Sequence, residues 1–112
     1  MIKKITVAHR NPNITHEEFS KHWFEVHAPL AARLIPNKVK YVQNHFIQVP
    51  GMEFQGDGIV EMYYESVEAW QEAEKVIRQT PELMADGPKF CVLKPGGVWI
   101  VEERVILDKT NK

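Results

Sequence analysis

The sequence is short of cysteine and of turn-forming residues, and each shortage excludes a class of protein. The only cysteine, Cys91, cannot close a disulfide within the chain, which favours a reducing compartment over a disulfide-stabilised secreted fold. Only 6 glycines and 7 prolines occur in 112 residues, fewer than disordered or fibrous chains contain. We therefore expect an ordinary globular protein in which Cys91 is a small buried side chain rather than a nucleophile.

Charge of one sign and long apolar runs are also missing. The formal net charge is −1 and the 14 lysines and arginines are scattered, so the sequence indicates no phosphate-binding surface for nucleic acid. The first ten residues turn polar too soon for a secretory signal peptide, and no apolar run approaches the ~20 residues that cross a bilayer. We expect a cytoplasmic protein that binds neither nucleic acid nor membrane.

The chain has the length of one domain, and we expect a single domain over residues 1–107 with a frayed tail over 108–112. Alternating and β-branched patterns predict strands over residues 3–9, 38–49, 58–64 and 98–107. Apolar spacings of three and four predict a helix over residues 15–34, a second helix after Ser66, and then a short helical turn up to Gly87. The order βαββαβ predicts an α+β fold, a ferredoxin-like antiparallel sheet with both helices on one face.

The first predicted helix contains a proline and two histidines. Pro29 removes a backbone N–H and its ring clashes one turn back, so we expect the helix to kink or restart near His27. His22 and His27 are five residues apart, about 140° around an ideal α-helix. We therefore expect that the two histidines cannot share a face to bind a metal ion and, with a single cysteine, that the protein has no metal site.

The second face of the predicted sheet is too apolar for water. In the last strand Trp99 and Val101 lie on one face and Val98 and Ile100 on the other, so neither face is polar. Most soluble oligomers have two-fold symmetry, so we expect a homodimer in which two sheets pack face to face. The alternative is a monomer that leaves a large apolar patch in water.

Four segments, in order along the chain, resemble one known family. They are FSKHWFEVHAPLA, KYVQNHF, GDGIVEMYYESVEAW and VWIVEERVIL, with Phe90 before the last. The helix pattern W-x-x-x-H-A-P-L and the strand pattern Y-V-Q-x-H are the most specific of these. Together they resemble the EthD family of dimeric α+β-barrel proteins over nearly the whole chain. The resemblance implies a homodimer whose sheets enclose a cavity beneath the helices, a small hydrophobic or aromatic organic ligand, and an activity that varies among relatives on one scaffold.

His27 is the leading candidate for chemistry. An imidazole with an unperturbed pKa near ~6.5 exchanges a proton at neutral pH without a cofactor. Trp23 lies one turn earlier on the same helical face, so the pair can present an aromatic wall beside a base. The alternative is a histidine that only hydrogen-bonds the backbone near Pro29.

The second and third strands carry further candidates. Tyr41, Gln43 and His45 share one face of their strand, which is natural for a lined cavity, and the alternative is a solvated sheet face. Two interpretations of Glu61 stay open. It is either a carboxylate in poor solvent, whose pKa burial raises and which suits acid/base work, or an ion-pair partner of Arg104 across the sheet, which a single glutamate slightly favours. We assign the cavity wall to Trp23, Gln43, Tyr63, Phe90 and Trp99.

Two function classes follow. The first is a cofactor-independent enzyme, an oxidoreductase, isomerase or lyase type, that transfers a proton with His27 while Tyr41, His45 or Glu61 orients the substrate. The second is a non-catalytic binder or accessory protein of an oxidative degradation pathway. The sequence lacks a glycine-rich nucleotide loop, which argues against a dinucleotide; haem or flavin in the cavity stays open. His9 and His16, at a strand end and a helix start, are expected to be solvent-exposed.

Overall fold

The computed structural model describes residues 1–92, 94 and 96–110. Its strands are β1 (Ile2–Arg10), β2 (Lys38–His45), β3 (Gly58–Tyr64), β4 (Cys91–Val92) and β5 (Val98–Val101). Its helices are α1 (His16–His22), the π-helical turn η1 (Trp23–His27), α2 (Ala28–Leu34), α3 (Val67–Arg78) and α4 (Pro81–Phe90). No helix in this described part of the chain is long and apolar enough to span a membrane.

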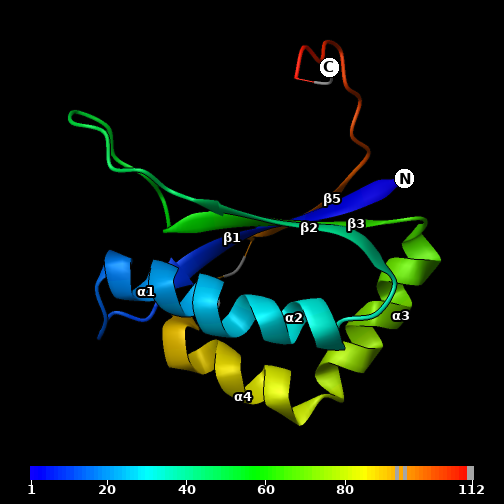
Figure 1. Ribbon diagram of the computed structural model, residues 1–112, viewed down its shortest axis with the longest axis horizontal. Coiled ribbons are helices and arrows are strands. Elements are labelled where there is room, and N and C mark those ends of the chain that lie inside the picture. The colour runs from blue at the N-terminus through cyan, green and yellow to red at the C-terminus, as the bar shows by residue number, and fades with distance from the viewer. Residues whose placement is uncertain (93, 95, 111–112) are drawn as a thin grey trace.

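The strands form one antiparallel sheet in the order β2-β3-β1, with β4 and β5 both pairing with β1. Ile5 in the central strand faces Glu61 of β3 on one side and Trp99 of β5 on the other. All the helices cover the same face of the sheet, while its other face carries none (Figure 1). The predicted α+β fold, a ferredoxin-like antiparallel sheet with helices on one face, is confirmed.

Two strands are shorter than their sequence patterns predict. The second strand ends at His45 rather than Val49, and residues 46–57 form the connection to β3. The last strand ends at Val101 rather than Leu107. Val101 lies opposite Lys3, so β1 has almost no residues left with which a longer strand could pair.

The region after α3 is more helical than the sequence predicts. The expected short turn up to Gly87 is instead the ten-residue helix α4, which continues through Pro88 to Phe90. Pro88 removes the helical donor to the Met84 carbonyl oxygen, and burial of Phe90 to 3% exposure favours the extra turn in spite of that loss.

The irregularity expected near His27 takes the form of a π turn. The N–H of Ala28 donates to the carbonyl oxygen of Trp23, five residues back, and α2 begins at Ala28 with Pro29 in its first turn. A proline is tolerated there because the first N–H groups of a helix need no helical acceptor. Residues five apart are brought close together by such a turn.

Two apolar clusters lie between the sheet and the helices. The larger consists of Ala31, Ile35, Tyr64, Ala73 and Leu83. The smaller consists of Phe19 of α1, Trp23 of η1 and Phe90 at the end of α4. A Cβ atom at Gly58 of β3 would lie 2.5 Å from Trp23 Cζ3, so the indole ring packs directly on the strand backbone.

Candidate functional site

The π turn brings His22 and His27 onto one buried carboxylate. His22 Nε2 lies 3.0 Å from Asp86 Oδ1, and His27 Nδ1 lies 2.9 Å from Asp86 Oδ2. The expectation that the two histidines point apart was wrong, because it assumed 3.6 residues per turn throughout the helix. Asp86, on α4, is 3% exposed and uses both oxygens in these contacts. The described part of the chain contains no cluster of His, Cys, Asp and Glu side chains that could hold a metal ion.

The carboxylate sets the tautomers of both rings. Burial works to raise the pKa of Asp86, but the hydrogen bonds from His27 and His22 outweigh it and hold that pKa below its usual range. An ionised carboxylate only accepts hydrogen bonds, so His27 donates through Nδ1 and His22 through Nε2. This leaves His27 Nε2 and His22 Nδ1 without a hydrogen-bond partner among the described residues.

The ring of Phe90 packs against the imidazole rings of both His22 and His27. Its ring centroid lies 4.9 Å from that of His22 and 4.9 Å from that of His27. A groove of about 440 Å³ runs along this edge between α1, η1 and α4. His22 and Phe90 line it together with Ile14, Glu18, Lys21, Glu25, Val26 and Lys89. His22 therefore lies between the aromatic cluster and this open groove, whereas His27 is not among the residues that line it.

Tyr41, Gln43 and His45 form a hydrogen-bonded row on the helix-facing side of β2. Gln43 Nε2 donates to the Tyr41 hydroxyl and to the carbonyl oxygen of Trp23, both at 2.9 Å, and Gln43 Oε1 lies 2.8 Å from His45 Nε2. The Trp23 carbonyl is the same group that closes the π turn. Gln43 thus acts on the backbone that places His27.

The aromatic cluster separates this row from the histidine pair. The ring of His45 contacts Trp23 at 4.6 Å between centroids, and Trp23 contacts Phe19, which contacts Phe90. Among the described residues, His27 makes no hydrogen bond to Tyr41, Gln43 or His45. Burial, followed by the charge of His16, lowers the pKa of His45, so this imidazole favours its neutral form.

Glu61, Tyr63 and Trp99 lie on the opposite, helix-free face of the sheet. Glu61 Oε1 accepts from Lys3 Nζ at 2.5 Å, and its Oε2 accepts from Asn44. These bonds, that of Lys3 first, lower the pKa of Glu61, so the expected rise was wrong. The other interpretation, an ion pair with Arg104, was also wrong, because Glu61 pairs with Lys3 and Arg104 with Glu102. Glu61 is a fixed negative charge that does not meet His27.

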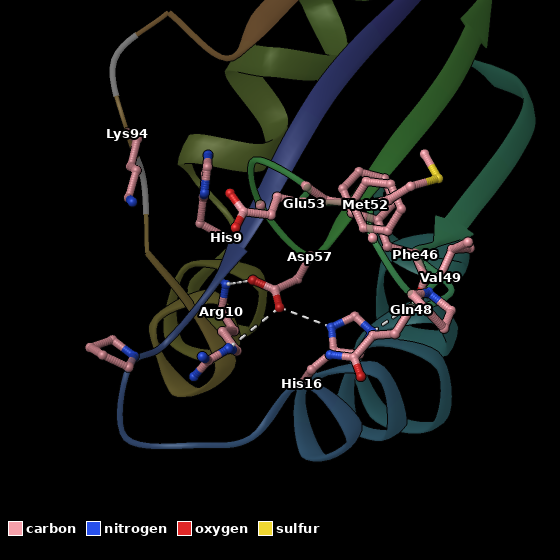
Figure 2. A pocket seen from close by; sticks show the side chains of 15 residues that line it. His9, Arg10, His16, Phe46, Gln48, Val49, Met52, Glu53, Asp57 and Lys94 are labelled. Atoms are coloured by element: carbon pink, nitrogen blue, oxygen red, sulfur yellow. Dashed lines mark hydrogen bonds and ion pairs between the residues drawn. The ribbon is translucent and has the colours of Figure 1, made fainter.

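Two further polar residues with buried or half-buried side chains, Asp86 and His16, were not among the candidate site residues of the sequence analysis. Asp86 lies 59 residues from His27 in the chain, in a segment without a recognisable motif, so only the fold could bring them together. His16 was expected to be exposed, yet its side chain is 19% exposed and bonded through both ring nitrogens (Figure 2).

Comparison with known proteins supports the fold and the family. An EthD-family protein of Bacillus halodurans is 26% identical, with a TM-score of 0.62, over 93% of this chain and 100% of that one. An EthD-like protein of Ralstonia eutropha is 16% identical, with a TM-score of 0.67, over 99% and 97%. A protein of Arabidopsis thaliana is 14% identical, with a TM-score of 0.58, over 96% and 99%; these two show a shared fold.

No curated protein matches this chain significantly in sequence. The EthD domain, in contrast, matches residues 11–93. That span begins directly after β1, extends through β4, and includes η1, Gln43 and Asp86. Because the match covers well over half of the chain, the protein belongs to the EthD family.

Proposed function

We propose that this protein is a cytoplasmic, cofactor-independent enzyme that transfers a proton on a small hydrophobic or aromatic organic compound, with His27 as the base and acid. The observation that carries the proposal is the 2.9 Å contact between His27 Nδ1 and the buried Asp86 carboxylate. It fixes the tautomer in which Nε2 bears the reactive lone pair.

The reaction cycle needs only groups that the chain supplies. His27 Nε2 removes a proton from a carbon or oxygen acid of the substrate, and the resulting imidazolium is stabilised by the Asp86 carboxylate at Nδ1. The same imidazolium then returns the proton to a different atom of the substrate. His22 binds the other oxygen of Asp86, so it keeps the carboxylate oriented while His27 changes charge.

The aromatic cluster supplies the setting for this step. Phe90 is 3% exposed and lies 4.9 Å from the His27 ring, so it gives the reacting group an apolar wall, which strengthens electrostatic contacts made beside it. Gln43 acts as a positioning residue through the Trp23 carbonyl. We propose that Tyr41 and His45, on the far side of Trp23, orient a polar group of a substrate that reaches past the indole.

The helix-free face favours a homodimer. Trp99 is 49% exposed on this face of β5, and beyond the strand Val105, Ile106 and Leu107 are exposed as well. A soluble protein rarely leaves such an apolar area uncovered, and a two-fold partner covers it most simply. In that arrangement Tyr63 and Trp99 line the space between two sheets rather than the site of His27.

Deuterium exchange tests the chemistry. Small ketones and lactones in deuterium oxide exchange their α-hydrogens when a base removes them, which NMR detects. We expect the wild-type protein to accelerate exchange in at least one probe and His27→Ala to abolish it. Asp86→Asn should reduce it about 10²- to 10⁴-fold, because the rings lose the carboxylate that fixes their tautomers. His9→Gln, a histidine outside this cluster, serves as the control.

The alternative, a non-catalytic binder, gives a different result. Native mass spectrometry would show a small organic molecule bound equally to the wild type and to His27→Ala, with no exchange in any probe. That outcome would overturn the assignment of His27 as a base.

A further inference from the structure

The hairpin between β2 and β3 encloses a second pocket, away from His27. Residues 46–57 leave the sheet and project beyond its end (Figure 1). Between this hairpin, the end of β1 and the start of α1 lies a pocket of about 950 Å³ (Figure 2). None of the residues that line it belongs to the histidine pair, to Asp86 or to the row on β2.

One histidine holds both ends of the hairpin. His16 Nδ1 lies 2.9 Å from Asp57 Oδ1, and His16 Nε2 lies 3.0 Å from the carbonyl oxygen of Phe46. Phe46 and Asp57 are the first and last residues of the hairpin, and they are bonded to each other through the Phe46 N–H. We call these three residues the His16 clasp.

The clasp is complete only when His16 is charged. A carbonyl oxygen and an ionised carboxylate both accept hydrogen bonds and donate none, whereas a neutral imidazole has one N–H. Only the imidazolium satisfies both contacts. The hydrogen bond to Asp57 accordingly raises the pKa of His16 against the opposing effect of burial. Arg10 also faces Asp57, while Glu17 and His45 are the other titratable groups near the ring.

The returning side of the hairpin is fixed to β1. The Asp57 N–H donates to the Ala8 carbonyl oxygen at 2.8 Å, and Asp57 Oδ2 accepts from the Arg10 N–H at 2.9 Å. Gly56 has φ of 94°, and a Cβ there would lie 2.8 Å from Val7 Cγ1, so only glycine fits this close approach. The clasp therefore positions the hairpin as one wall of the pocket.

The lining combines apolar surface with a positive charge balance. Phe46 and Phe54 are in ring contact at 5.3 Å on the hairpin wall, beside Met52. The charged or titratable lining residues are Arg10, Lys94, His9, His16, Glu53 and Asp57. With His16 protonated, three positive charges oppose two negative ones, and Asp57 is already paired with His16 and Arg10.

We propose that this hairpin pocket is a second small-molecule site, which takes an organic anion with an apolar body and is formed by the His16 clasp. The anionic group lies toward Arg10, and the apolar body lies against Phe46, Met52 and Phe54. Binding favours the imidazolium of His16, because that form both fixes the hairpin and adds a positive charge to the pocket.

NMR titration with benzoate tests the site, with benzyl alcohol as the uncharged probe of similar shape. Benzoate should shift the amide signals of Arg10, Met52 and Asp57 at about pH 5.5 and bind about fivefold more weakly at about pH 8.5, the effect of one unit charge in a solvent-open pocket. Benzyl alcohol should show weaker binding and no such pH dependence. Benzoate shifts confined to other residues, or equal affinity at both pH values, would refute the proposal.

His16→Gln and His9→Gln form a matched pair of variants. A glutamine at position 16 can donate to one acceptor but cannot become charged, so the pH dependence of benzoate binding should disappear. His9 lines the same pocket but has no hydrogen bond to another described residue through its side chain, so His9→Gln should keep that dependence. The clasp is disproved if His16→Gln behaves as the wild type does.

A direct measurement covers the case in which His16→Gln does not fold. Nitrogen-15 spectra of the imidazoles in the wild type should show both nitrogens of His16 protonated near pH 6.5, whereas a single protonated nitrogen would overturn the clasp. His27→Ala should leave benzoate binding at the hairpin unchanged, so the outcome here is independent of the proton-transfer proposal.

Discussion

At the scale of single residues, electrostatic partners decide what each ionisable group can do. Asp86 and Glu61 are both shielded carboxylates whose pKa is lowered, the first by two histidines and the second by Lys3 and Asn44. Burial raises the pKa of a carboxyl group only when no donor compensates. Asp86 is thus a fixed acceptor for His27, and Glu61 a fixed charge in the sheet.

Glu61 should contribute stability that depends on pH. Its pKa is lower in the folded chain, so the contribution is complete above the ordinary value of 4.5 and is lost as the pH falls through the folded value. Urea unfolding should show Glu61→Gln about 1–2 kcal/mol less stable than the wild type at pH 7, with the difference vanishing in acid. Glu72→Gln, at an exposed site on α3, should show little effect, and an unchanged difference at low pH would contradict the assignment.

At the scale of elements, the π turn and its support from β3 place the candidate site. The five-residue π turn η1 brings His22 and His27 to the same carboxylate. Within this turn, the Trp23 ring packs against the backbone of Gly58. A side chain at Gly58 would push the indole, and with it the turn, away from the sheet.

Two glycine-to-alanine changes test this packing against a neutral site. A Cβ at Gly58 meets Trp23 at 2.5 Å, whereas a Cβ at Gly87 in α4 meets nothing within 4 Å. Gly58→Ala should lower the free energy of unfolding by about 1–3 kcal/mol, and Gly87→Ala should raise it by about 0.5–1 kcal/mol through helix propensity. Thermal or urea unfolding measures both. Equal effects of the two changes would show that the indole is not held against β3.

At the scale of the whole molecule, one face of the sheet is covered by helices and the other is not (Figure 1). The uncovered face is partly apolar, but it also holds the network of Lys3, Glu61, Tyr63 and Glu103. A partner that covers this face must therefore accommodate satisfied polar groups as well as Trp99.

Sedimentation should show a dimer at micromolar concentration. Trp99→Lys should shift it to monomer, because it places a charge in the proposed interface. Met84→Lys is the matched control, since Met84 is 52% exposed and Trp99 49%, but Met84 lies on α4 in the helical layer. A wild-type monomer, or an equal effect of both changes, would remove the homodimer from the proposal.

The sequence by itself determined most of the order of elements and the placement of Tyr41, Gln43 and His45 on one face of their strand. These follow from periodicity and local hydrogen bonds, which neighbouring residues define. Resemblance to the EthD family also followed from short segments alone, and the domain match confirms it.

Only the tertiary structure decided which groups meet. Asp86 lies 59 residues from His27 in the chain, and Asp57 and Phe46 lie 41 and 30 residues from His16. At such separations, sequence spacing carries no geometric information. The π turn, too, departs from the ideal helical period, and the Trp23 carbonyl that closes it also accepts a hydrogen bond from Gln43 of β2. The sequence could therefore nominate His27, but the fold supplied Asp86, the partner that makes it a candidate base.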